Sequence, residues 1–339
     1  MPPLLPIPDA ADRALLQRAA DWPAYRAIDD LTRPALVDIA RRHGIDFATA
    51  IVYDRLLHRG SVRETMATLT ATLDEPPRDI LVGVVPGAFH KEYAFTGADG
   101  ERVLDAARRV GIRAERVPLP SFGSLYDNGR ILRDWVHQHR DEEICLVSLS
   151  KGGTDVQYAL TKPNAERDFQ NVSTWINLSG IVQGTALADW LLGQWWRSLM
   201  IRAFAWWRRY SFDVLHEIKR DGNPRLAHAF DWPCHLRVFH VIGFPLKRHM
   251  ENPWAKRAHR RLEPWGPSDG GGILLADAAR WPGTIIPLWG VDHYLRQDSC
   301  DVAALVLRML SKSWRQDSDL AEARSARSES CRHVNEVIS

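Results

Sequence analysis

The stretch ICLVSLSKGGTDVQYAL, residues 144–160, passes from a run of β-forming residues into a helical pattern through Ser-Leu-Ser-Lys-Gly-Gly. A serine hydroxyl is a weak nucleophile at neutral pH, and it needs a base, a stabiliser of developing charge and a backbone that exposes its oxygen. A sharp turn from strand to helix provides the last of these, but only if the residues two before and two after the nucleophile are small. Ser148 and Gly152 meet that requirement. The joint therefore predicts Ser150 as a nucleophile at the start of a helix, where free amides favour negative charge.

Two other interpretations of this joint are a phosphate-binding turn and a simple cap on the following helix. A P-loop places four residues between its first glycine and Gly-Lys-Ser/Thr. The segment SLSKGGT (148–154) does not have that spacing. The nucleophile is thus the preferred interpretation of Ser150, and the order of motifs along the chain decides it.

The pattern around the joint predicts an α/β fold. The run DILVGVVPG (79–87) is continuously apolar, which is typical of a strand buried on both faces of a parallel sheet. Strands and helices then alternate, which predicts an open, wound, mostly parallel sheet with helices on both faces. Further strands are expected at 113–120, 143–149, 172–180, 235–244 and 283–290, and helices at about 100–111, 125–139, 151–161 and 297–313.

Four regions are expected along the chain. Residues 1–75 have apolar residues at helical spacing and predict an N-terminal helical extension, and residues 76–313 gather the strands into one domain. Within it, residues 184–232 form an insertion that holds Trp190, Trp195, Trp196, Trp206 and Trp207. Residues 314–339 are polar and predict a mobile tail with little structure.

Composition excludes several classes of protein. Lys and Arg number 44 against 42 Asp and Glu, a net charge of +2, so no global field would attract nucleic acid. The four cysteines have no metal-ligand spacing, which indicates neither a disulfide framework nor a zinc site. Prolines and early acids interrupt the N-terminus, which does not match a secretory signal, so we expect a cytoplasmic protein. The apolar segment 189–210 carries Arg197 and Arg202 in its middle, which disfavours a membrane span.

Two further motifs follow later strands: WGPSDGGG (265–272) and LWGVDHYLR (288–296). With the serine joint they give the chain order Ser, Asp, His, and from about residue 78 to 313 the sequence resembles the α/β-hydrolase superfamily, in particular its lipase and esterase-like members. The resemblance implies a triad of Ser150 as nucleophile, Asp269 as acid and His293 as base. It also implies an oxyanion hole made by the backbone amides of Ala88 and Lys151.

Some assignments have competitors. Asp292, Asp277 and an acid after the strand at 172–180 are alternatives to Asp269. His90 lies beside the expected oxyanion loop and is expected to contact substrate or backbone rather than to act as the base. Pro86 stands where many superfamily members have His, which weakens the match of that loop.

The sequence thus predicts a serine hydrolase acting on an ester or thioester of a small hydrophobic acyl substrate, with the Trp-rich insertion as a cap and with no cofactor or metal. Three alternatives stay open. The triad could transfer the acyl group to another acceptor if the cap excludes water, or the fold could be an unreactive binding module. The Trp/Arg segment could also make a peripheral contact with lipid, as in an interfacial lipase. The sequence does not determine the oligomeric state.

Overall fold

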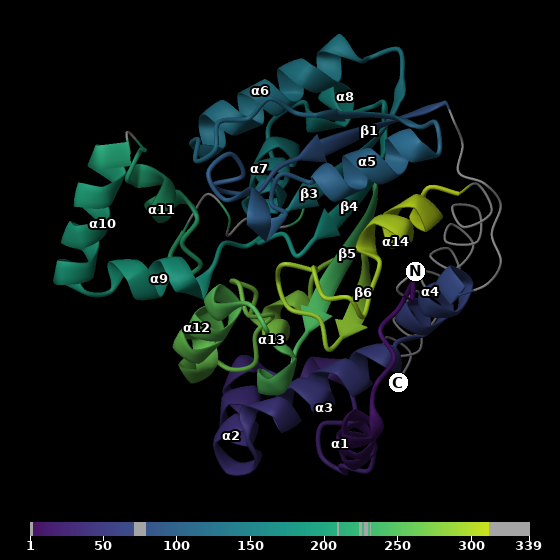
Figure 1. Cartoon of the computed structure of the whole chain (residues 1–339), viewed down its shortest axis with the longest axis vertical. Helices are drawn as coiled ribbons and strands as arrows, with labels where there is room; N and C mark the ends of the chain where they lie inside the picture. The colour runs from purple at the N-terminus through teal and green to yellow at the C-terminus, as the bar shows by residue number, and fades with distance from the viewer. Residues whose placement is uncertain are drawn as a thin grey trace, which may run out of the picture.

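The computed structural model describes residues 3–70, 79–208, 210–223, 226, 230 and 232–311. Its centre is a six-stranded sheet with the order β2-β1-β3-β4-β5-β6, in which every neighbouring pair is parallel (Figure 1). The strands are β1 (Ile80–Val85), β2 (Arg113–Arg116), β3 (Glu143–Leu149), β4 (Val172–Leu178), β5 (Arg237–Phe244) and β6 (Thr284–Trp289). The prediction of a wound α/β sheet is confirmed.

All six strands lie within the ranges predicted for them, and the strands inside the sheet are apolar because parallel strands covered on both faces need few polar residues. Every residue of β1 and β6 is buried. The edge strand β2 is shorter than the predicted 113–120 and is only partly buried. It ends at Arg116 because Pro118 and Pro120 have no N–H to donate to a ladder.

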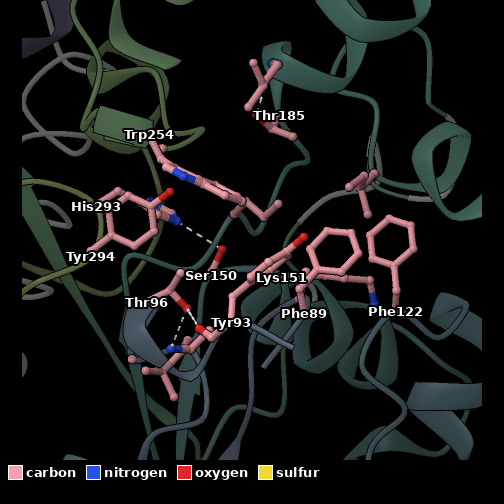
Figure 2. A pocket seen from close by; sticks show the side chains of 18 of the residues that line it. Phe89, Tyr93, Thr96, Phe122, Ser150, Lys151, Thr185, Trp254, His293 and Tyr294 are labelled. Carbon is pink, nitrogen blue, oxygen red and sulfur yellow. Dashed lines mark hydrogen bonds between the residues drawn. The ribbon is translucent and has the colours of Figure 1, made fainter. Parts of the chain in front are cut away.

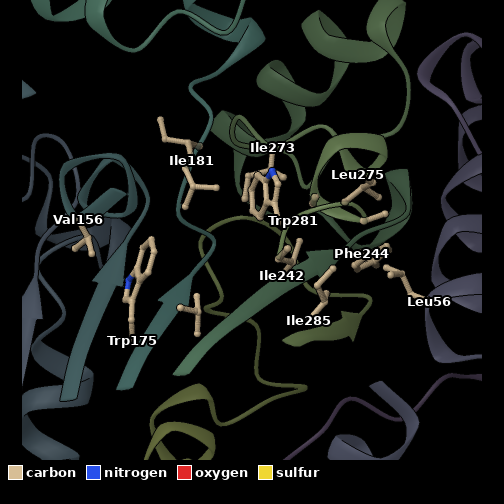
Figure 3. Packing of buried hydrophobic residues seen from close by; sticks show 14 of the residues in the cluster. Leu56, Val156, Trp175, Ile181, Ile242, Phe244, Ile273, Leu275, Trp281 and Ile285 are labelled. Atoms are coloured by element: carbon tan, nitrogen blue, oxygen red, sulfur yellow. The ribbon is translucent and has the colours of Figure 1, made fainter. Parts of the chain in front are cut away.

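Helices cover both faces of the sheet and create two cores. One core joins β1, β3, β4 and β5 to α6 (Leu125–Gln138), α7 (Lys151–Leu160) and the N-terminal helices. Figure 3 shows its central part, where Trp175 and Ile242 of the sheet lie among Ile181, Ile273 and Trp281. The other core joins the opposite face to α5 (Glu101–Arg109) and α14 (Val302–Met309).

The N-terminal segment is helical as predicted, with α1 (Ala10–Ala20), α2 (Arg33–His43), α3 (Ile45–Leu57) and α4 (Gly60–Thr70). Nearly all of α3 is buried, and the ring of Tyr53 lies 5.5 Å from that of Phe244 in β5 and 4.9 Å from that of Trp289 in β6. The N-terminal helices therefore share the core of the sheet. The expected boundary at residue 75 falls outside the described residues, and so does the tail at 314–339.

The connections after β4 and β5 are also helical. Between β4 and β5 lie α9 (Ala186–Leu192), α10 (Trp195–Arg208) and α11 (Asp213–Glu217), which extend away from the sheet in Figure 1. The stretch after β5, for which the sequence predicted no helix, contains α12 (Pro253–Leu262) and α13 (Leu275–Ala278). Pro253 stands at the first position of α12, where it does not interrupt a helix.

The remaining short elements complete the chain. The last predicted helix, 297–313, is shorter in the structure, because the side chain of Asp301 caps α14 at its N-terminus. The other short helices are α8 (Ala165–Asp168) and the 3₁₀ turns Ile28–Asp30, Ala94–Thr96, Lys247–His249 and Glu263–Trp265.

Candidate active site

Ser150 occupies the turn between β3 and α7 with φ 48° and ψ −119°, a left-handed conformation that is rare for a residue with a side chain. A Cβ on Gly152 would lie 2.5 Å from the carbonyl oxygen of Val85 and 2.7 Å from that of Pro86. The chain therefore has room only for glycine two residues after Ser150. Backbone strain of this kind is characteristic of a side chain that must be presented to a site.

His293 connects Ser150 to Asp269 through two hydrogen bonds. The Ser150 hydroxyl donates to His293 Nε2 across 3.0 Å, and His293 Nδ1 donates to Asp269 Oδ2 across 2.6 Å. The backbone N–H of His293 also donates to the carbonyl oxygen of Asp269 across 2.7 Å. Three residues that are 24 and 143 positions apart along the chain thus form one continuous hydrogen-bonded array.

The carboxylate of Asp269 is completely buried and held by the backbone. Its Oδ1 accepts hydrogen bonds from the amides of Gly271, Gly272 and Ile273, at 2.9 to 3.0 Å. This leaves Oδ2 for His293. Amides that satisfy one oxygen fix the carboxylate and stabilise its charge away from water.

The environment of His293 favours its protonated form. Burial lowers its pKa, but the charge of Asp269 and the hydrogen bond to it outweigh burial, and the pKa of His293 is raised above its ordinary value. An imidazole of raised basicity that accepts from a serine hydroxyl can remove that proton when the oxygen attacks an electrophile.

The carboxylates that competed with Asp269 in the sequence have other partners. Asp277 accepts hydrogen bonds of 2.6 and 2.7 Å from Arg220, and Asp189, the acid after β4, accepts from the amide of Arg220. Asp292 accepts from the amide of Tyr294, and burial raises its pKa. Of these acids, Asp269 is the one that contacts His293.

The loop after β1 brings Ala88 next to the serine turn. Ala88 and Lys151 both border the cavity at Ser150, and within the described residues neither backbone amide has a protein acceptor. Phe89 has φ 57°, and its N–H donates to the carbonyl oxygen of Ser121 across 2.8 Å, which fixes the loop. Two free amides beside a serine hydroxyl can bind an oxyanion.

His90, the competing base, is buried and faces this loop. Its Nδ1 lies 3.1 Å from the carbonyl oxygen of Gly87, and burial lowers its pKa. A neutral His90 that donates to Gly87 holds the backbone next to Ala88. The expectation that His90 contacts backbone therefore agrees with its position.

The arrangement can be compared with known proteins. No family model matches the chain, and no curated protein is significantly similar to it in sequence. Among solved structures, it is similar to the metagenomic carboxyl esterase MGS0156, with a TM-score of 0.51 and 16% identity over 76% of this chain and 79% of that one. It also matches the mature Bacillus licheniformis lipase BlEst2, with a TM-score of 0.49 and 21% identity over 71% of this chain and 94% of that one.

The chain has the α/β-hydrolase fold. In this α/β-hydrolase fold, Ser150 follows β3, Asp269 lies in the connection after β5, and His293 follows β6. All three connections leave the carboxyl ends of parallel strands, so they meet at one edge of the sheet.

An apolar cavity of about 410 Å³ opens at Ser150. Figure 2 shows Ser150 between Trp254 and Tyr294 on one side and Phe89 and Phe122 on the other. The rings of Phe89 and Phe122 stack at 4.7 Å. The insertion at 184–232 lines the rest of the cavity with aliphatic side chains, which are Leu187, Ala188, Leu191, Ile201, Ala205, Leu215 and Ile218.

Polar groups around the cavity are few. The side chain of Lys151 is buried and pairs with Asp155 at 2.7 Å instead of reaching the hydroxyl of Ser150. Among the residues that the structure describes, no cluster of three or more His, Cys, Asp or Glu could hold a metal ion. The same residues include no helix with the length and apolarity needed to cross a bilayer.

Two features that support the site were not anticipated from the sequence. A Cβ on Gly271 would lie 1.9 Å from the His293 ring, so this position must be glycine; the run of three glycines after Asp269 is its only signal in the sequence. A buried hydrogen-bond chain also runs beneath the serine turn, from Trp175 through Ser148 and Asn177 to His240. Its members come from three strands, and no local motif reveals them.

Proposed function

We propose that this protein is a serine hydrolase that cleaves a carboxylic ester or thioester of a hydrophobic acid. One observation carries the proposal: the hydrogen-bonded array of Ser150, His293 and Asp269 opens into an apolar cavity. Nucleophile, base and orienting acid are the components that acyl transfer through a covalent intermediate requires.

In the proposed mechanism, Ser150 Oγ attacks the substrate carbonyl carbon while His293 Nε2 takes the hydroxyl proton. The tetrahedral oxyanion accepts hydrogen bonds from the amides of Ala88 and Lys151. As the carbon–oxygen or carbon–sulfur bond to the leaving group breaks, the proton on His293 passes to that group, which leaves an acyl ester on Ser150.

Deacylation repeats these steps with water. His293 takes a proton from water as its oxygen attacks the acyl carbon, and then returns that proton to Ser150 as the free acid departs. Asp269 remains a carboxylate throughout and stabilises the imidazolium. Its full burial and three backbone hydrogen bonds support this role.

The cavity suggests the substrate class. Its walls are aliphatic and aromatic near Ser150, so an acyl chain or ring gains free energy by leaving water there, roughly 25 cal/mol per Å² of apolar surface buried. We therefore expect esters of longer acyl chains to have higher kcat/KM values than acetate esters.

The test is the intact mass of the protein after exposure to a fluorophosphonate, in a detergent that opens a cap. One adduct on wild type, absent from Ser150→Ala and retained by Ser211→Ala, is the expected result; Ser211 is a matched control because it borders the same cavity. An unmodified wild type would overturn the proposal and favour the binding-module alternative. An adduct with acyl transfer to added alcohols in preference to water would favour the acyltransferase alternative.

A further inference from the structure

Helix α10 presents an apolar face to its surroundings. At about 100° per residue, half of its positions fall within an arc of roughly 140°. These positions are Trp195, Trp196, Leu199, Met200, Ala203, Trp206 and Trp207. All seven are apolar and exposed, with Trp195 at 78% and Trp206 at 83%. A surface helix normally places polar residues on this side.

The opposite side of the helix is already used. Ile201 and Ala205 fall on it and line the cavity at Ser150. The outward residues are therefore not needed for the protein's own core, and α10 lies at the outer edge of the molecule in Figure 1. Large contiguous apolar patches are rare on soluble proteins unless they contact another body.

The charged residues within helix α10 are all basic. From Trp190 to Phe212 the sequence contains Arg197, Arg202, Arg208 and Arg209 and no acidic residue. The Arg197 guanidinium lies 4.0 Å from the centre of the Trp190 ring, and that of Arg202 lies 4.8 Å from the Phe212 ring. A segment with four positive charges, in a chain of net charge +2, is complementary to an anionic surface.

These features distinguish a lipid surface from a second copy of the chain. Pairing two copies through this face would oppose two segments of the same positive charge, and such like-charge juxtaposition is unfavourable. At a bilayer, indole rings lie at the headgroup level and arginine binds lipid phosphate, so both residue types are satisfied at once.

We infer that the outward face of α10 docks on a bilayer that contains anionic lipid, with the helix in the plane of the interface. Docking does not involve Ser150. Because Ile201 and Ala205 lie on the cavity side of the same helix, docking would also hold the cavity beside lipid, where apolar esters partition. That last consequence rests on the proposed function.

The experiment is co-sedimentation of the full chain with vesicles of phosphatidylcholine alone or mixed with phosphatidylglycerol. We expect Ser150→Ala to bind the mixed vesicles as wild type does, and binding to weaken as salt is raised. The double variant Trp195→Gln/Trp206→Gln should have a partition coefficient about tenfold or more below that of wild type. Arg202→Glu should weaken binding to the mixed vesicles but not to vesicles of phosphatidylcholine alone.

The matched control is Tyr126→Gln on α6, which removes an aromatic side chain that is 66% exposed outside α10. It should bind as wild type does, and equal thermal unfolding midpoints would show that all variants are folded. Equal binding by wild type and the double tryptophan variant would overturn the inference. The inference would also be overturned if wild type does not bind vesicles and instead forms a dimer in sedimentation equilibrium that the tryptophan changes dissociate. Because Ser150→Ala is expected to bind, a failure of docking and a failure of the proposed chemistry are separate results.

Discussion

The amide oxygen of Asn177 lies 1.8 Å from the position that a Cβ atom on Gly180 would occupy. The same oxygen lies 2.5 Å from a Cβ position on Gly153, and it accepts a hydrogen bond of 2.8 Å from Ser148. The end of β4 and the first turn of α7 thus close around one buried amide. Because Ile181 N–H donates to the carbonyl oxygen of Ser150 across 3.1 Å, this contact also positions the serine turn.

Gly180→Ala should therefore damage both stability and the site. The added methyl cannot be accommodated without displacing Asn177 from its hydrogen bonds, and we expect a loss of at least about 2 kcal/mol in the free energy of unfolding. Denaturant unfolding and the rate of fluorophosphonate labelling would measure the two effects. Gly60→Ala is the control, since a Cβ there meets nothing within 4 Å. Unchanged stability and labelling in Gly180→Ala would contradict this account of the turn.

The fold was largely predictable from the sequence because strands buried on both faces give continuous apolar runs. Ser150 and His293 each follow such a run directly, whereas Asp269 was assigned from the resemblance of its loop to the acid loop of α/β-hydrolases. Their catalytic roles stay predictions. The sequence could not show that Asn177, Ser148 and His240 meet, because this contact joins side chains from three strands across the sheet. Helix α12 was not predicted, although Asn252 caps it, Pro253 stands at its first position and Ala255, Ala258 and Leu262 are buried on one face.

The raised pKa of His293 predicts how the rate of ester hydrolysis depends on pH. A general base acts in its neutral form, so kcat/KM for ester hydrolysis should rise with pH through the pKa of His293, which lies above its ordinary value. Asp269→Asn removes the charge that outweighs burial, and the rising limb should move to lower pH while kcat falls by about 10³–10⁴-fold. Asp292→Asn is the control: its charge raises the pKa of His293 without contacting the ring, so a smaller shift with little loss of rate is expected. An unmoved limb in Asp269→Asn would exclude His293 as the titrating base.

Removing one partner of the buried ion pair between Lys151 and Asp155 should lower the free energy of unfolding. Both side chains are almost fully buried, and Asp155 also accepts a hydrogen bond of 2.9 Å from Asn128. Burial raises the pKa of Asp155 even with Lys151 beside it. Lys151→Met leaves this carboxyl without a cation and should reduce the free energy of unfolding by about 3 kcal/mol.

Adding Asp155→Asn to Lys151→Met should recover part of that loss, because a neutral amide keeps a hydrogen bond with Asn128 without a buried charge. Urea unfolding of the two single variants and the double variant would give the coupling free energy between the residues. Additive losses would show that the pair does not act as a unit.

The acyl-chain preference should depend on the insertion. Leu191 of α9 lines the cavity, and Leu191→Trp would fill part of it. The ratio of kcat/KM for an octanoate ester to that for an acetate ester should fall about tenfold or more, because the longer chain loses its apolar contacts. Leu192→Trp is the neighbouring control that does not border the cavity. If both variants keep the wild-type ratio, the acyl chain occupies another part of the site.

The packing of α3 against β5 and β6 has a consequence for biosynthesis. Residues 45–57 leave the ribosome well before residues 237–289, whose strands β5 and β6 form one side of the surface that buries them. At common translation speeds this delay is on the order of ten seconds or more, during which Tyr53 lacks the rings of Phe244 and Trp289. The nascent chain is therefore a natural client for a chaperone that holds apolar helices, and its final compaction must await completion of the last strand.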